Sequence, residues 1–79
     1  MNASFVPAAM HKKHDGLDYT IVLKPDDSTV YLDIEELGLH QHHVHTSCEK
    51  NDWEHLEDEG DKAAFTIIDL HNAAPKGLF

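Results

Sequence analysis

The chain has 79 residues and carries 15 Asp and Glu against six lysines and no arginine, which gives a formal net charge of −9 with neutral histidines. A chain of this length buries roughly 60–65% of its unfolded surface, so we expect one small domain over residues 1–79, without the deep cleft of most enzymes. Its 41% content of hydrophobic residues excludes a disordered tail. The sequence shows no signal peptide, no apolar run near the roughly 18–20 residues of a membrane span, and one cysteine that cannot form an intrachain disulfide, so we expect a cytoplasmic protein.

The charge also restricts the kind of partner. Arginine supplies most bidentate contacts to phosphate and guanine, and its absence argues against direct binding of nucleic acid. An acidic surface attracts basic proteins and repels DNA, RNA and anionic membranes. The eight histidines make this charge adjustable, because their protonation between about pH 7 and about pH 5 would remove most of it.

The first half of the chain predicts a β-hairpin preceded by an arm. Residues 1–16 look irregular and end in the turn signal Asp-Gly. The stretch "LDYTIVLK", residues 17–24, alternates between apolar and polar side chains, as does "TVYLDI", residues 29–34. Between them, "PDDS" has the composition of a turn, so the two runs predict adjacent antiparallel strands.

The middle of the chain is less regular. "EELG", residues 35–38, predicts one helical turn with Asp33 as its cap and Gly38 as its stop. "LHQHHVHT", residues 39–46, is ambiguous, and we favour an extended segment. Thr46 and Glu49 match the capping-box spacing and predict a helix from there to residue 59.

The end of the chain adds a strand to this pattern. Gly60 would stop the helix, and "AAFTIIDL", residues 63–70, predicts a central strand because it is rich in β-branched and aromatic side chains. Residues 72–79 would form a tail. The order of elements predicts an α+β fold, a small antiparallel sheet of three to four strands with one helix packed on a face.

The histidine-rich segment is a candidate metal site. In an extended chain His40 and His42 would share one face and His43 and His45 the other, so each pair brings two imidazoles together. A set of soft and borderline ligands suits Zn²⁺, Ni²⁺ or Cu²⁺. The sequence does not fix four ligands, and solvated histidines on a polar strand remain the alternative. The candidate ligands are His40, His42, His43, His45 and Cys48.

Catalysis has little support in the sequence. Cys48 and His45 are close enough along the chain to form a thiol–imidazole pair. The sequence shows no glycine-rich elbow and no phosphate-binding loop, and a lone cysteine is more often a small buried apolar residue. We therefore expect a protein that is not an enzyme.

The acidic run "EKNDWEHLEDEGD", residues 49–61, is the candidate binding surface. As a helix it would present one carboxylate per roughly 2.6 Å, which lies between the phosphate densities of duplex and single-stranded DNA. Trp53 and Leu56 would face inward and the carboxylates outward, with Trp53 or Tyr31 available as an aromatic anchor. The alternative is a solvated face. The predicted partner-binding residues are Asp52, Trp53, Glu54, Glu57, Asp58, Glu59 and Asp61.

These observations predict a non-enzymatic acidic binding protein that occupies a basic site of a partner, most plausibly a nucleic-acid-handling protein, as an inhibitor or nucleic-acid mimic. In size and charge alone the chain resembles phage-encoded inhibitors of host nucleic-acid enzymes and immunity proteins that neutralise nucleases. The alternative hypothesis is a small histidine-rich protein that binds a transition metal.

Overall fold

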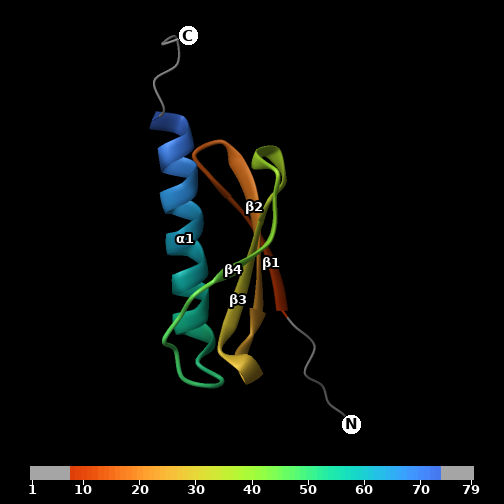
Figure 1. The fold of residues 1–79 in the computed structure, drawn as a ribbon, viewed down its shortest axis with the longest axis vertical. Helices are drawn as coiled ribbons and strands as arrows, with labels where there is room; N and C mark the ends of the chain where they lie inside the picture. The colour runs from red at the N-terminus through yellow and green to blue at the C-terminus, as the bar shows by residue number, and fades with distance from the viewer. Residues whose placement is uncertain (1–7, 74–79) are drawn as a thin grey trace.

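The computed structural model describes residues 8–73, which form four β-strands followed by one long helix (Figure 1). The sheet is antiparallel with strand order β1-β2-β3-β4, and the helix packs across one of its faces. The predicted α+β fold class is therefore confirmed. In chain order the elements are β1 Ala8–His14, β2 Leu17–Lys24, the 3₁₀ turn η1 Pro25–Asp27, β3 Thr29–Ile34, the 3₁₀ turn η2 Glu35–Leu37, β4 Leu39–Val44 and α1 Trp53–Ala73.

The predicted hairpin of residues 17–34 is confirmed as β2, η1 and β3. Pro25 begins the η1 turn, and Ser28, in the left-handed region at φ 51°, closes it by donating its backbone N–H to the Pro25 carbonyl oxygen at 3.1 Å. Side chains at alternate positions of both strands are buried against the helix, as the period-two pattern predicted. They are Leu17, Tyr19, Ile21, Leu23, Val30, Leu32 and Ile34.

The expectation of an irregular arm over residues 1–16 is wrong for residues 8–14, which form β1; residues 1–7 lie outside the described part of the chain. β1 pairs along its whole length with β2 across the turn at residues 15–16. The strand escaped prediction because a charged side chain, Lys12, stands at one of its inward positions, where the alternation rule expects an apolar residue.

Residues 39–46 were predicted to be extended, and Leu39–Val44 of this segment form β4. A bulge interrupts the pairing of β4 with β3 between Leu32 and Ile34. Gln41 has a positive φ of 50°, and its backbone N–H donates to Asp33 Oδ1 at 2.7 Å. Asp33 therefore holds the bulge and does not cap the η2 turn, as had been predicted. Gly38, at φ 70°, ends that turn as expected.

The predicted helix start is wrong by several residues, because α1 begins at Trp53. Asp52 is its N-cap, with Oδ1 accepting the backbone N–H of His55 at 3.3 Å. The Thr46 hydroxyl, predicted as the cap, instead accepts the backbone N–H of Cys48 at 3.2 Å and donates to the Ser28 carbonyl oxygen at 3.1 Å. Thr46 thus shapes the loop between β4 and α1.

The predicted strand over residues 63–70 is also wrong, because these residues continue α1 through Gly60 to Ala73. Every fourth residue of the helix, Leu56, Gly60, Ala64 and Ile68, is buried against the sheet. Of the predicted tail at 72–79, residues 72 and 73 are helical and 74–79 lie outside the described part. Over residues 8–73, no helix has the length and apolar character needed to cross a membrane.

Close packing of α1 on the sheet explains why a glycine, Gly60, lies in the middle of this helix. A Cβ atom at this position would lie 3.0 Å from the Ile21 Cγ2 atom and 3.0 Å from the Val30 Cγ1 atom. The helix backbone therefore approaches β2 and β3 as closely as the side chains allow. The first turns of α1 lie beside the end of the sheet that carries η1 (Figure 1).

Candidate functional site

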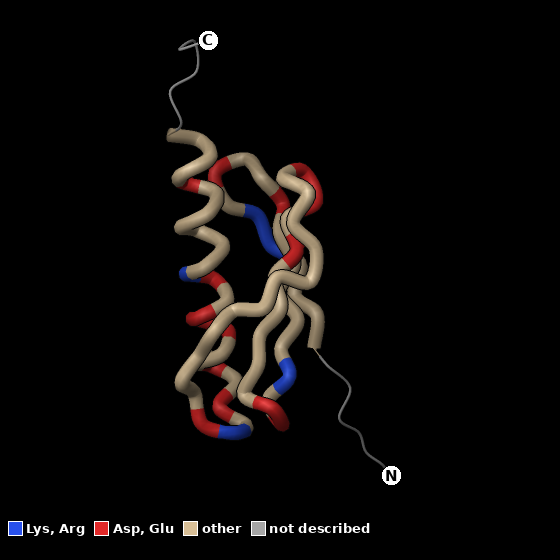
Figure 2. The backbone as a smooth tube through the Cα atoms, viewed as in Figure 1, with Lys and Arg blue, Asp and Glu red and all other residues tan. Residues whose placement is uncertain are grey.

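Exposed carboxylates gather at the end of the molecule where α1 begins (Figure 2). Three segments meet there, namely η1, the loop before the helix and the first turns of α1. Their contact is fixed by the backbone N–H of Asn51, which donates to the carbonyl oxygen of Pro25 at 3.1 Å. We refer to these carboxylates as the acidic end; they are Asp26, Asp27, Glu49, Asp52, Glu54 and Asp58, of which Asp52 is half-buried and the other five are exposed.

The N-terminus of α1 accounts for only part of the acidity at this end. Asp52 and Glu54 lie at the helix N-terminus, where the partial positive charge of the backbone stabilises carboxylates. Asp26, Asp27 and Glu49 do not belong to that helix, and no ion pair among residues 8–73 involves them. Helix stabilisation therefore explains only part of the charge.

Trp53 is the first residue of α1 and stands among these carboxylates. It had been predicted to face inward, but 45% of it is exposed, whereas Leu56 is fully buried as predicted. A tryptophan provides a large apolar surface, and its exposure leaves that surface available to a partner. The acidic end thus combines negative charge with one aromatic side chain.

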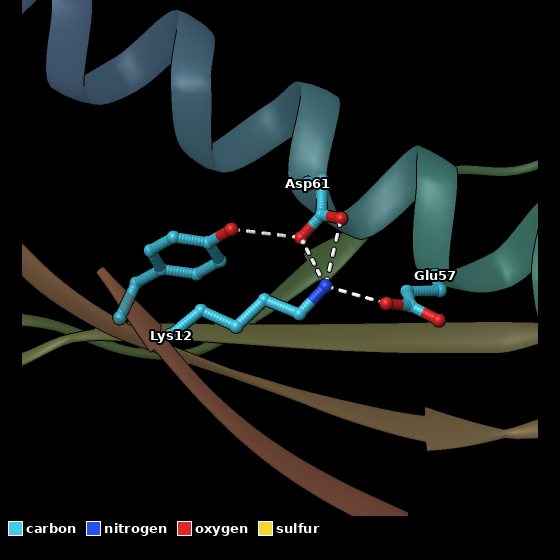
Figure 3. A network of polar contacts seen from close by, with 4 residues as sticks. Lys12, Glu57 and Asp61 are labelled. Carbon is cyan, nitrogen blue, oxygen red and sulfur yellow. Dashed lines mark hydrogen bonds and ion pairs between the residues drawn. The ribbon is translucent and has the colours of Figure 1, made fainter. Parts of the chain in front are cut away.

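Two of the predicted partner-binding residues do not face outward. Glu57 and Asp61 turn toward β1, where both accept hydrogen bonds from the Lys12 ammonium group, at 2.9 Å for Asp61 Oδ2 (Figure 3). Asp61 Oδ1 also accepts the Tyr19 hydroxyl at 2.8 Å. Glu59 is half-buried and lies within 3.6 Å of His55 and 3.5 Å of Lys62. Asp52, Glu54 and Asp58 remain at the surface.

The network of Lys12, Tyr19, Glu57 and Asp61 joins the edge strand to the helix. Burial of Tyr19, together with its hydrogen bond to Asp61 and the negative charge of that carboxylate, raises the pKa of the phenol to about 12. Partial burial by itself would lower the pKa of Lys12, but its hydrogen bonds to Glu57 and Asp61 and their charges outweigh this and raise the pKa above its ordinary value. Both groups therefore stay protonated well above neutral pH.

This network predicts a loss of stability in alkali. The folded state favours the protonated phenol of Tyr19, so this contribution is complete below about pH 10 and disappears as the pH rises toward about 12. The contribution of Lys12 falls in the same direction above about pH 10.5. Urea unfolding between about pH 9 and about pH 11.5 should show the wild type losing on the order of 2 kcal/mol, and Tyr19→Phe losing clearly less.

Tyr31→Phe is the matched control, because Tyr31 lies on the opposite face of the sheet and outside the network. Its loss of stability over the same pH range should equal that of the wild type. If the free energy of unfolding falls equally with pH in the wild type and in Tyr19→Phe, the phenol of Tyr19 does not form its hydrogen bond to Asp61 in solution.

A second polar contact joins β1 to the far half of the helix. The Asp69 carboxylate lies 2.8 Å from His14 Nε2, and the His14 ring stacks on Phe65 with centroids 4.1 Å apart. The Asn72 amide donates to the Asp15 carboxylate at 3.0 Å. Sequence reasoning missed Lys12, Tyr19 and His14 as helix partners because their carboxylates lie more than 40 positions away in the chain.

The histidines are only partly brought together. The rings of His43 and His45 lie with centroids 4.9 Å apart, in agreement with their predicted proximity. His42 pairs opposite Leu32, but the bulge and the positive φ of Gln41 interrupt the strand between His40 and His42, so the regular alternation on which their predicted shared face depended does not run through this segment.

The sulfur ligand predicted for this site is not at the surface. Cys48 is buried in the core, 8% exposed, as the alternative interpretation of a small apolar residue had it. Within residues 8–73, the structure shows no group of three or more His, Cys, Asp or Glu side chains placed to hold a metal ion. Metal binding by the histidine segment therefore stays a prediction, with only His43 and His45 adjacent.

The chain matches no known family model, no curated protein and no solved structure at a significant level.

Proposed function

We propose that this chain is a non-enzymatic binding protein that places its acidic end on a basic site of a partner protein. The observation that carries this proposal is the exposure of Trp53 amid carboxylates of which only Asp52 lies in ion-pair range of a basic side chain of residues 8–73, with its Oδ2 atom 3.6 Å from His55 Nδ1. Carboxylates attract a basic surface over long range, and a tryptophan at their centre supplies short-range binding energy. A protein that handles nucleic acid has such a basic surface.

The mechanism is occupation of the basic site. The carboxylates of η1, the loop and α1 come from three segments, so they form a patch and not a single line of charge. A phosphate-binding site on the partner would contact this acidic patch over its whole area. While the chain is bound there, the partner cannot bind its nucleic acid. This corrects the simpler hypothesis of a phosphate-like track along one helix, because Glu57 and Asp61 are engaged with Lys12.

The test compares two variants of equal net charge. Glu49→Gln/Glu54→Gln/Asp58→Asn removes three carboxylates of the acidic end, while Asp18→Asn/Glu35→Gln/Glu36→Gln removes three exposed carboxylates at the opposite end of the molecule. A partner is first captured from the source lysate with wild-type protein. Stopped-flow association at low salt should then be slowed about three- to tenfold by the first variant and much less by the second.

Salt provides the internal control for this experiment. Near 0.5 M salt the Debye length falls to roughly 4–5 Å, so the difference between the variants should shrink. Trp53→Ala should mainly raise the dissociation rate at every salt concentration, because it removes a short-range contact. If the two charge variants slow association equally, only the net charge of the protein affects the association rate, and the acidic end is not the binding site.

A further inference from the structure

His43 and His45 form a pair of imidazole rings at the end of β4. Their ring centroids lie 4.9 Å apart, with the ring planes at 85° to each other. Val44, between them, is buried and pairs opposite Val30. Both neighbours of this inward residue are exposed, so the two rings project away from the core. The way in which the strand is anchored therefore brings the rings side by side.

The spacing of the rings matches that of two histidines bound to one metal ion. A metal–nitrogen bond of roughly 2.1 Å places the ion about 3.2 Å from the centre of each ring. The two ring centres then lie about 4.5 Å apart for a square-planar angle and about 5.2 Å apart for a tetrahedral angle. The observed 4.9 Å falls between these values. Rotation of the exposed rings is enough to direct one nitrogen of each toward a common point.

The nitrogens of these two rings have no other partner in the described chain. His11, His14 and His55 each have a ring nitrogen within 3.6 Å of a hydroxyl or carboxylate oxygen. Among residues 8–73, the ring of neither His43 nor His45 makes a hydrogen bond or an ion pair. An ion that binds this pair would therefore break no existing polar contact.

Tyr31 restricts the motion of one of the two rings. It pairs opposite His43 across β3 and β4, and the two rings pack with centroids 5.5 Å apart. The Lys24 ammonium group lies over the Tyr31 ring, 4.8 Å from its centroid. Because His43 is already held on one side, it loses less side-chain freedom when it binds an ion. The net charge of −9 offsets the repulsion between Lys24 and a bound cation.

We infer that His43 and His45 bind one divalent transition-metal ion, Zn²⁺, Ni²⁺ or Cu²⁺, with water at its remaining positions. Imidazole nitrogen is a good ligand for all three ions. The site has two protein ligands, since no group of three or more candidate ligands comes together within residues 8–73 and the Cys48 thiol is buried. The inference is independent of the proposed function, because neither histidine belongs to the acidic end.

Calorimetric titration of the tag-free chain with Zn²⁺ tests the pair. His43→Gln and His45→Gln should each weaken binding at least tenfold, because the second imidazole acts at a high effective concentration once the first has bound. The double variant should bind no more weakly than either single variant, since one imidazole alone cannot chelate. His40→Gln/His42→Gln is the matched control, because it removes two exposed histidines of the same strand, and it should stay within about twofold of the wild type.

Nuclear magnetic resonance gives a readout that needs no variant. In the wild type, Zn²⁺ should shift the ring signals of His43 and His45 at lower concentration than those of the other histidines. Cys48→Ala should bind as the wild type does, because the buried thiol is not a ligand. Wild-type binding that does not saturate below about 1 mM, equal weakening by the control pair, or a large loss in Cys48→Ala would each overturn the inference.

Discussion

Replacing Ile68 by Ala should lower the free energy of unfolding by about 2–5 kcal/mol, whereas Leu70→Ala should cost less than about 0.5 kcal/mol. Ile68 is fully buried between α1 and the sheet, so its truncation leaves a cavity, while Leu70 is 68% exposed. The two residues are a direct test of the helix. In a strand, residues two apart share a face and would respond alike.

Urea unfolding of both variants beside the wild type measures both values. Circular dichroism should show unchanged helix content for Leu70→Ala. Similar large losses at both positions would contradict the helical assignment of residues 63–70 and restore the strand that the sequence pattern favours.

Replacing Gly60 by Leu should destabilise the protein by about 3 kcal/mol or more, although Leu is the better helix former by roughly 0.8 kcal/mol. Even a Cβ atom at this position would lie 3.0 Å from both Ile21 and Val30, so a larger side chain must push α1 away from the sheet. The displacement would also loosen the contact of Asp61 with Lys12 and Tyr19, which depends on the same spacing.

Asp58→Leu is the control, because Asp58 is exposed two positions earlier in the same helix. It should leave the free energy of unfolding within about 0.5 kcal/mol of the wild type. A Gly60→Leu variant as stable as the Asp58→Leu variant would mean that the helix does not pack on β2 and β3 at this point.

The sequence pattern predicted the parts of the fold in which local and tertiary preferences agree. β2 and β3 alternate apolar and polar side chains around a proline turn, so their local pattern and their burial coincide. The strand prediction for residues 63–70 was wrong because two preferences disagree there. Their β-branched and aromatic side chains favour a strand locally, whereas burial at every fourth position, ending at Ala64 and Ile68, favours the helix. The prediction that Gly60 ends the helix was wrong for a similar reason, because this glycine allows α1 to pack closely on the sheet and does not terminate it.

The candidate site was predictable only in part. The acidic character of residues 49–61 and the inward position of Leu56 follow from composition and helical spacing. Which carboxylates remain at the surface depends on Lys12, whose position beneath the helix is set by the pairing of β1 with β2. The contribution of η1 to the acidic end depends on its contacts with the loop before α1, the backbone hydrogen bond from Asn51 to Pro25 and the hydrogen bond from the Thr46 hydroxyl to Ser28. None of these long-range contacts leaves a signal in local sequence.

The strand order β1-β2-β3-β4 has a consequence for how the chain folds. Each strand pairs with its neighbour in sequence, so each pairing closes a short loop and costs little chain entropy. The sheet can therefore assemble early, before the helix that follows all four strands has docked. The apolar face of the sheet, including Ile21, Val30 and Leu32, is covered only by α1, the last element of the described chain, so shielding this face from other chains depends on the packing of one helix.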